Sequence, residues 1–426
     1  MSSTVIDRTK APEARDITSF SLLPAKQHEL PNGIPVTYLV GGAQPIITLQ
    51  IEFEASRLHE PKHGISSYMA KMLGEGTKSH TSGQISEHFE AYGAFWQASA
   101  SPDRVTLEVY CLAKHFGKVL PMVRELLQEA VFPEEEWMIT QAIEAQRLKM
   151  NLGRNSFRAS RQFKSHIFGA QHPYGYNTQQ YDIQAVSAEE LKAFYQDHIV
   201  NAPFHIFLSG QIEDEHFKLL EEYLGQSSVK SDKNQTPPMP ELSTVFKPYY
   251  EEKAEALQSS VRIGKPFFLK NHPDHVPFFI VNTLLGGYFG SRLMQNIREE
   301  KGLSYGINSG LMQTKHSSMF FIQAEVQKAK KDEALSEVYK EMKRLCEEPV
   351  GEEELHRVKN YRCASLMKSI TSPVSILECH KNIWMYDLPS DYYDTYTDKI
   401  WSVTAEQVQQ LAQKYLSGDF VEVVVG

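Results

Sequence analysis

The sequence predicts an α+β fold that is used twice, as two homologous domains in tandem. Three observations support this prediction. The chain has 426 residues, which is more than one hydrophobic core usually holds. Residues 227–248 are rich in Pro, Ser, Lys and Asp and have the composition of a linker between two halves of similar length. The halves also repeat one layout of helices and strands, as expected after a duplication.

The first half begins its pattern with a strand and a helix. Residues 47–56 alternate apolar and polar side chains, as a half-buried strand does, and residues 257–267 are the equivalent strand of the second half. Residues 64–74 carry apolar side chains at helical spacing. Positions 67, 70 and 71 of this helix lie close together, because residues three and four apart share a face.

The later elements of each half also correspond. Helices are expected from Phe132 and from Pro349, each with acidic residues in its first turn, where the helix dipole favours them. Residues 186–210 and 403–426 then both place Ser or Thr before Ala-Glu, followed by an amphipathic helix, a short break and an apolar strand. Ser and Thr accept hydrogen bonds from the first backbone amides, so both helices should start there.

The composition excludes several classes of protein. The formal net charge is −9 and no long run of Lys and Arg is present, which argues against nucleic acid as a partner. No stretch approaches the roughly 20 apolar residues of a membrane span, and the polar N-terminus does not resemble a signal peptide. Four scattered cysteines predict free thiols and favour the cytoplasm, with the periplasm and an organelle matrix left open. These are Cys111, Cys346, Cys363 and Cys379.

Four segments carry a resemblance to a known family. They are GISSYMAKMLGEGTKSHTSGQISEHFEAYGAFWQASASPD (64–103), PNGIPVTYLV (31–40), FGAQHPYG (168–175) and GGYFGSRLMQNIREEKGLSYG (286–306). In this order they resemble the insulinase or pitrilysin family of zinc peptidases, the inverzincins. The resemblance implies an N-terminal extension (1–25) and two metallopeptidase-like domains (26–226 and 249–426). Each would be a mostly antiparallel sheet packed with helices, a sandwich of ferredoxin type.

The helix at 64–74 is expected to have lost the family's metal site. Family members carry H-x-x-E-H there, and the three positions correspond to Ser67, Ala70 and Lys71. The family's third ligand, a Glu on a later helix, falls near Leu148, with Glu144 one turn earlier. Zinc needs three protein ligands and a base, and these residues do not supply them. We therefore expect no metal in this chain.

The other candidate catalytic residues give weaker signals. His59 and His63 flank Pro61, and His272 and His275 flank Pro273, so both pairs are expected to be solvated loop histidines. The sequence contains no G-x-S-x-G motif, phosphate-binding loop or dinucleotide fingerprint.

The second half retains residues that resemble the family's other active-site group. Arg298 and Tyr305 stand at the family's spacing for the Arg and Tyr that act on the substrate backbone and the oxyanion. Guanidinium and phenol donors suit that task. Considered alone, Arg298 is better interpreted as a solvated charge at a helix end and Tyr305 as a half-buried strand aromatic; within the matched motif the functional interpretation is favoured. Gly286 and Gly287 are expected to contact substrate, as a glycine-containing loop does in some family members.

Residues 93–111 begin with a strand that the family exposes as an edge for peptide substrate. Gln97 and Ala98 stand where the family usually has Asn-Ala, and both are expected to bind substrate.

These expectations combine into one functional hypothesis. The chain is expected to be the non-zinc-binding subunit of a heterodimeric metallopeptidase, with Arg298 and Tyr305 acting on peptide at a partner's zinc. The partner would be a homologous subunit with an intact H-x-x-E-H, and this chain would bind no cofactor itself. The alternative is an inactive scaffold or a peptide-binding homodimer of the same fold.

Overall fold

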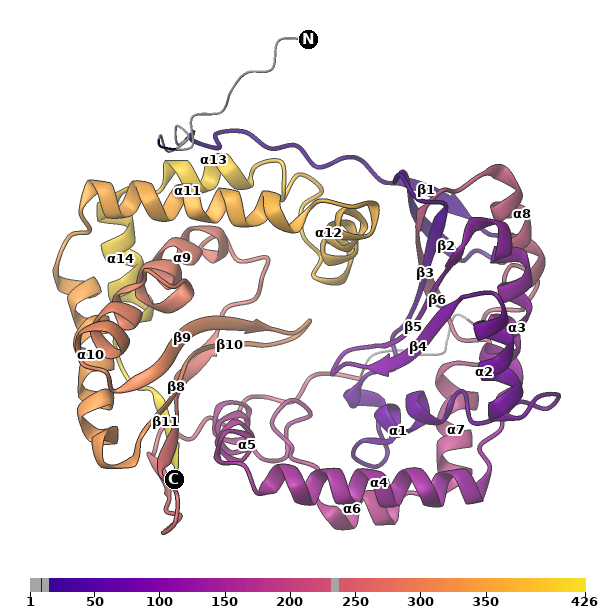
Figure 1. Cartoon of the computed structure of the whole chain (residues 1–426), viewed down its shortest axis with the longest axis horizontal. Helices are drawn as coiled ribbons and strands as arrows, with labels where there is room; N and C mark the ends of the chain where they lie inside the picture. Colours follow the sequence, from indigo (N-terminus) through magenta and orange to yellow (C-terminus); the bar gives the residue numbers. More distant parts are fainter. Residues whose placement is uncertain (1–8, 10–14, 231–236) are drawn as a thin grey trace.

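The structure, a computed structural model, describes residue 9, residues 15–230 and residues 237–426. Two domains, each a sheet with helices packed on it, lie on opposite sides of the molecule (Figure 1). All strands of the first sheet lie between Lys26 and Gly210, and all strands of the second lie between Tyr249 and Val425. The predicted α+β class with two similar domains is confirmed.

The first sheet has six strands in the order β1-β2-β6-β3-β5-β4. Its neighbours are antiparallel except for the parallel pair of β2 and β6. The central strand β3 is almost entirely buried, and β5 alternates buried and half-buried residues. The strands are β1 (Lys26–Glu29), β2 (Pro35–Val40), β3 (Ile46–Phe53), β4 (Phe95–Ala100), β5 (Val105–Leu112) and β6 (Phe204–Gly210).

The helices of the first domain build one large apolar core with this sheet. They are α1 (Ile65–Met72), α2 (Ser82–Ala91), α3 (Phe116–Glu129), α4 (Glu134–Leu152), α6 (Gln180–Ala185), α7 (Ala188–His198) and α8 (Asp214–Tyr223), with short 3-10 turns η1 (Arg57–His59) and η2 (Ala113–His115). As predicted, Ser187 caps α7 by accepting a hydrogen bond from the Glu190 backbone amide.

The second sheet has five strands in the order β7-β11-β8-β10-β9, with β7 and β11 parallel. The strands are β7 (Tyr249–Glu251), β8 (Gln258–Phe267), β9 (Ser304–Gln313), β10 (Ser318–Gln327) and β11 (Val421–Val425). The helical elements are α9 (His275–Asn282), the π-helical turns η3 (Thr283–Gly287) and η4 (Met294–Glu300), the 3-10 turn η5 (Lys328–Lys330), α10 (Lys331–Glu347), α11 (Glu352–Ser369), α13 (Tyr396–Ser402) and α14 (Ala405–Tyr415). Thr404 caps α14 as Ser187 caps α7.

Each domain lends one helix to the sheet of the other. Helix α5 (Asn155–Phe168) follows α4 in the chain but packs on β8 and β11, where Phe163 and Ile167 join Val423 in a shared apolar cluster. Helix α12 (Pro373–Met385) follows α11 and packs on β2 and β6, where Leu377 meets Leu39 and Phe207. Figure 1 shows α5 beside the second sheet and α12 beside the first.

The two segments that the sequence assigned outside the domains are also packed. Within the predicted extension, Ile17 and Leu22 pack on the core of the second domain, and the Trp401 indole donates to the Ile17 carbonyl at 2.7 Å. Within the predicted linker, the backbone amides of Ser243 and Val245 bond the end of α5. Residues 1–8, 10–14 and 231–236 of these two segments lie outside the described residues.

His275 corrects one expectation. It begins α9, is 1% exposed, and its Nδ1 lies 3.0 Å from the Tyr392 hydroxyl. The prediction of a solvated loop histidine is wrong here, because the helix starts directly after the Pro-Asp turn and the ring is buried in the core.

In the described ranges, no helix is long and apolar enough to cross a membrane.

Candidate functional site

Helix α1 keeps the shape of a metal-binding helix. It begins after Gly64, whose φ of +88° favours glycine, and Glu60 accepts hydrogen bonds from the Gly64 and Ser66 amides. Ser67 and Lys71, one turn apart, both line a cavity, whereas Ala70 is 3% exposed and belongs to the core. Of the three motif positions, two therefore face the cavity.

An ion pair joins α1 to α4 beside the cavity. The Lys71 ammonium lies 2.7 Å from the carboxylate of Glu144 on α4, and Arg147 lies 2.6 Å from the same carboxylate. The Glu144 side chain is only 12% exposed. Leu148, one turn further along α4, lines the same cavity without contacting an ion.

The residues present do not fit a zinc ion. The described residues contain no group of three His, Cys, Asp or Glu side chains that could hold a metal. Positions 67, 70 and 71 of α1 offer a hydroxyl, a methyl and an ammonium, and the nearby Glu144 carboxylate is already paired with two cations. The Glu60 carboxylate is bonded to the start of α1, and the His63 ring is stacked on Tyr176. Such a set gives zinc neither its ligands nor a base.

The cavity beside α1 has a volume of about 560 Å³. Ala100 and Ser101, at the end of β4, line it together with residues of α1, α4 and α5. Strand β4 is the last strand of the first sheet, and no described strand pairs with its outer edge. An extended chain added along β4 would therefore lead to this cavity.

The other predicted residues of β4 have partners within the sheet. Gln97 is exposed and its side-chain amide donates to Glu108 of β5 at 2.9 Å. Ala98 is half-buried.

The structure brings Arg298 and Tyr305 together. The Arg298 guanidinium carbon lies 5.3 Å from the centre of the Tyr305 ring and 4.7 Å from the centre of the Phe289 ring. Its Nε is 3.5 Å from Glu299. Tyr305 is 89% exposed and Phe289 is 67% exposed. Two exposed rings thus hold the faces of a guanidinium and leave its edge to hydrogen-bond a ligand.

Phe289 is a residue that sequence reasoning did not single out as functional. It follows Gly-Gly-Tyr at the end of η3, outside any apolar periodicity. The signal that could have found it is a large aromatic residue in a glycine-containing turn, with no apolar residues at helix or strand spacing around it.

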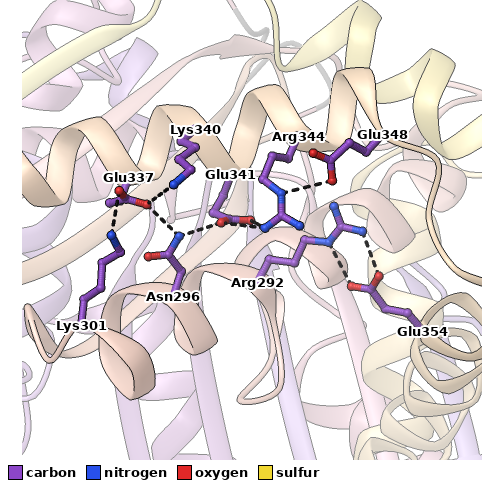
Figure 2. A network of polar contacts seen from close by, with 9 residues as sticks. All are labelled: Arg292, Asn296, Lys301, Glu337, Lys340, Glu341, Arg344, Glu348 and Glu354. Carbon is purple, nitrogen blue, oxygen red and sulfur yellow. Dashed lines mark hydrogen bonds and ion pairs between the residues drawn. The ribbon is translucent and has the colours of Figure 1, made fainter.

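A network of charges fixes η4, which carries Arg298 (Figure 2). The Asn296 amide donates to Glu337 at 2.9 Å and to Glu341 at 2.7 Å, both on α10, and Lys301 lies 2.9 Å from Glu337. Arg292, just before η4, makes two bonds to Glu354 of α11. Hydrogen bonds from Lys301 and Asn296 lower the pKa of Glu337 to about 2, so Glu337 stays ionised at neutral pH.

The two predicted glycines serve close packing. A Cβ at Gly286 would lie 2.7 Å from the Ser309 hydroxyl of β9, and one at Gly287 would lie 2.9 Å from the Asn282 amide nitrogen. Glycine therefore lets η3 approach β9, next to Phe289.

A polar bridge joins the turns of the two domains. Lys315, in the turn after β9, lies 3.1 Å from Glu54, and its backbone amide donates to Asp103 in the turn after β4 at 3.0 Å. Arg104 lies 3.1 Å from Glu54 as well. Burial raises the pKa of Glu54, but Lys315 and Arg104 outweigh it and hold the pKa below its usual value.

Comparisons with known proteins match both domains to one family. Residues 43–198 match the insulinase family (peptidase family M16), and residues 185–361 match the peptidase M16 inactive domain. A Bacillus subtilis protein named "Uncharacterized zinc protease YmxG" is 24% identical over 370 residues, which cover 86% of this chain and 89% of that protein. A Helicobacter pylori protein named "Non-peptidase homolog YmxG" is 22% identical over 403 residues, covering 90% and 89%.

A solved structure shares the fold. The peptidase M16 inactive domain from Pseudomonas fluorescens matches with a TM-score of 0.82 and 21% sequence identity, covering 95% of this chain and 98% of that one. This likeness confirms the fold that the sequence predicts.

Proposed function

The chain is an inactive-type member of the insulinase (peptidase M16) family, and from this premise we propose that it lends Arg298 and Tyr305 to the zinc site of a homologous partner. Peptide hydrolysis would then belong to the pair rather than to either chain. The partner carries an intact H-x-x-E-H and holds the zinc ion.

The pairing of Arg298 with an exposed phenol carries this proposal. Tyr305 is 89% exposed and its ring lies against the Arg298 guanidinium. The α1 helix of the same chain lacks the ligands for a metal ion, so the pair has no zinc site to act on within its own chain. A network that fixes η4 from the opposite side supports the same inference, because catalytic donors must be held in place before substrate arrives.

We further infer that Glu144 occupies the family's third ligand position, rather than Leu148. Its carboxylate contacts residue 71, the position of the second His of the motif. In this interpretation Lys71 replaces the charge of the metal with a tethered ammonium. That replacement keeps a buried carboxylate paired, and an unpaired one would be costly.

In the assembled pair, zinc supplies an activated water when it is bound to the partner. Arg298 donates through its guanidinium edge to a carbonyl of the extended peptide. Tyr305 donates its O–H to the oxygen on which negative charge develops. Gln97 and Ala98 lie on an edge strand that binds the peptide backbone, and Gly286 and Gly287 let η3 approach β9 next to Phe289.

Reconstitution tests the proposal. The chain is co-expressed with its homologue that contains H-x-x-E-H, and hydrolysis of a peptide library is measured. Tyr305→Phe and Arg298→Ala should each lower kcat by about 10²-fold, as loss of one oxyanion donor does elsewhere. The matched controls Tyr181→Phe and Arg124→Ala, which alter an exposed phenol and an exposed guanidinium away from η4, should leave kcat unchanged. Equal activity of all four variants would contradict the assigned role.

The second candidate function is a peptide-binding homodimer without hydrolysis. The free edge of β4 and the cavity at its end favour this candidate, and one relative is named as a non-peptidase homologue. It predicts a stable dimer of the isolated chain that binds peptides, and no hydrolysis with any homologue. All four cysteines are free, so under either function we place the protein in the cytoplasm.

A further inference from the structure

We propose that the cavity beside α1 binds the carboxylate of an extended peptide, either its C-terminus or an acidic side chain near it. This inference rests on the proposed peptide-binding role and names the chemistry that the peptide must carry. Three arginines line the cavity. Arg147 is paired with Glu144, and Arg57 of η1 and Arg161 of α5 provide the binding groups.

Both guanidinium groups are held by backbone carbonyls rather than by carboxylates. Arg57 donates from Nη1 to the Pro173 carbonyl at 3.2 Å, and Arg161 donates from Nη2 to the Asn177 and Thr178 carbonyls at 3.3 and 2.9 Å. Neither arginine has an ion-pair partner in the described parts of the chain. The segment 173–178 therefore orients both cations while leaving further N–H groups of each for a ligand.

The carboxylates around the cavity are already occupied. Glu60 accepts hydrogen bonds from the Gly64 and Ser66 backbone amides at the start of α1. It also accepts one from the Ser66 hydroxyl at 2.5 Å. Glu144 is shared between Lys71 and Arg147. The Asp182 carboxylate accepts hydrogen bonds from the Tyr176 hydroxyl and the Gln179 backbone amide, and its charge partly offsets the burial that lowers the pKa of Arg161. Glu60 has no ion-pair partner among the described residues, but Arg57 and Arg161 together outweigh its charge, so the unpaired charge at the cavity is net positive.

The position of the cavity favours a peptide as the source of the carboxylate. Ala100 and Ser101 bring the end of the free edge strand β4 to its wall. A peptide that runs parallel to β4 places its last residues there, at the C-terminal end of the strand. Burial of Arg161 lowers its pKa, and a bound carboxylate would offset that cost of desolvation.

Binding to the isolated full-length chain tests the inference. Fluorescence anisotropy compares a labelled hexapeptide that ends in glutamate with the same peptide ending in glutamine amide. The free acid should bind at least tenfold more tightly, and Arg57→Gln or Arg161→Gln should remove most of this difference. Arg124→Gln, an exposed arginine on α3, is the matched control and should preserve it. Circular dichroism checks that each variant is folded.

Three outcomes would overturn the inference. They are equal binding of the two peptides, an acid preference that survives both substitutions, and competition by inorganic phosphate that equals competition by the unlabelled free-acid peptide. The last result would indicate a site for free anions. None of these measurements involves a partner or hydrolysis, so a failed reconstitution of peptidase activity would leave the binding result separately interpretable.

Discussion

Lys71 and Glu144 connect two helices by an ion pair at a position that the resemblance assigns to the H-x-x-E-H motif. Sequence comparison with the H-x-x-E-H motif predicted the loss at Ser67, Ala70 and Lys71. It did not predict the ion pair, because the partner of Lys71 lies 73 positions further along the chain, and only packing of α1 against α4 sets which residue of α4 it meets.

Restoring the motif should restore a metal site. The variant Ser67→His/Ala70→Glu/Lys71→His supplies two imidazoles one turn apart and frees Glu144 as third ligand. We expect about one zinc ion per chain, measured by elemental analysis after dialysis.

The control for this variant adds Glu144→Gln, which removes the third ligand and should lower zinc affinity by at least about tenfold. A folded triple variant that retains no zinc would contradict the inferred role of Glu144.

Two buried histidines should make stability depend on pH. Burial, with help from nearby cations, lowers the pKa of His205 to about 4 and that of His275 to about 3. In the unfolded chain both titrate near pH 6.5, so the unfolded state binds more protons below that pH. Stability should therefore be full above pH 6.5 and should fall as the pH decreases towards 4, by about 1.4 kcal/mol per pH unit for each histidine.

Urea unfolding at a series of pH values measures this effect. His275→Gln should lower stability at neutral pH but flatten its dependence on pH. An unchanged slope in this variant would show that folding does not lower the pKa of His275.

At the scale of elements, sequence patterns predicted several of the helices and strands in place. The expected strands at 47–56 and 257–267 are β3 and β8, and the expected helix at 64–74 is α1. Local periodicity and capping residues suffice for this. They do not reveal that α5 and α12 pack on the sheet of the other domain. An amphipathic pattern shows that one face of a helix is buried, but it does not show which sheet buries that face.

The exchanged helix α5 should carry much of the energy that joins the domains. Phe163 is 2% exposed, and a Cβ at Gly264 of β8 would lie 2.8 Å from its ring. Phe163→Ala should lower the free energy of unfolding by about 3 to 5 kcal/mol. Phe289→Ala, at an exposed ring, should change it by less than about 0.5 kcal/mol. Chemical denaturation of both variants measures the difference, and similar losses would contradict the role of α5.

At the scale of the whole molecule, two kinds of contact join the domains: the polar bridge from Lys315 to Glu54 and Asp103, and the packing of α5 and α12. Glu54 and Lys315 are partly exposed, and pairs of this kind contribute little to stability. We expect Lys315→Ala to leave the two domains together, because α5 and α12 hold them.

The same substitution should speed amide hydrogen exchange in the turns at 101–104 and 314–317 while α5 and α12 stay protected. Lys343→Ala, an exposed lysine on α10, is the control and should change neither turn. Faster exchange throughout α5 and α12 in Lys315→Ala would show instead that the bridge holds the domains together.

The duplicated layout could be predicted from the repeated caps and strands, and the family from its motifs. How the halves interlock could not, because Leu22, Phe163 and Leu377 each look like an ordinary apolar residue of its own half.

The exchange of α5 and α12 also constrains the order in which the protein is made. The first sheet is complete once β6 has left the ribosome, but the helix that covers β2 and β6 comes only with residues 373–385. During synthesis of the second half, the nascent first domain keeps an apolar face around Leu39 and Phe207 open to water. Such a face is a binding site for chaperones. We expect truncation after residue 226 to leave an insoluble fragment, and co-expression of residues 227–426 to rescue it.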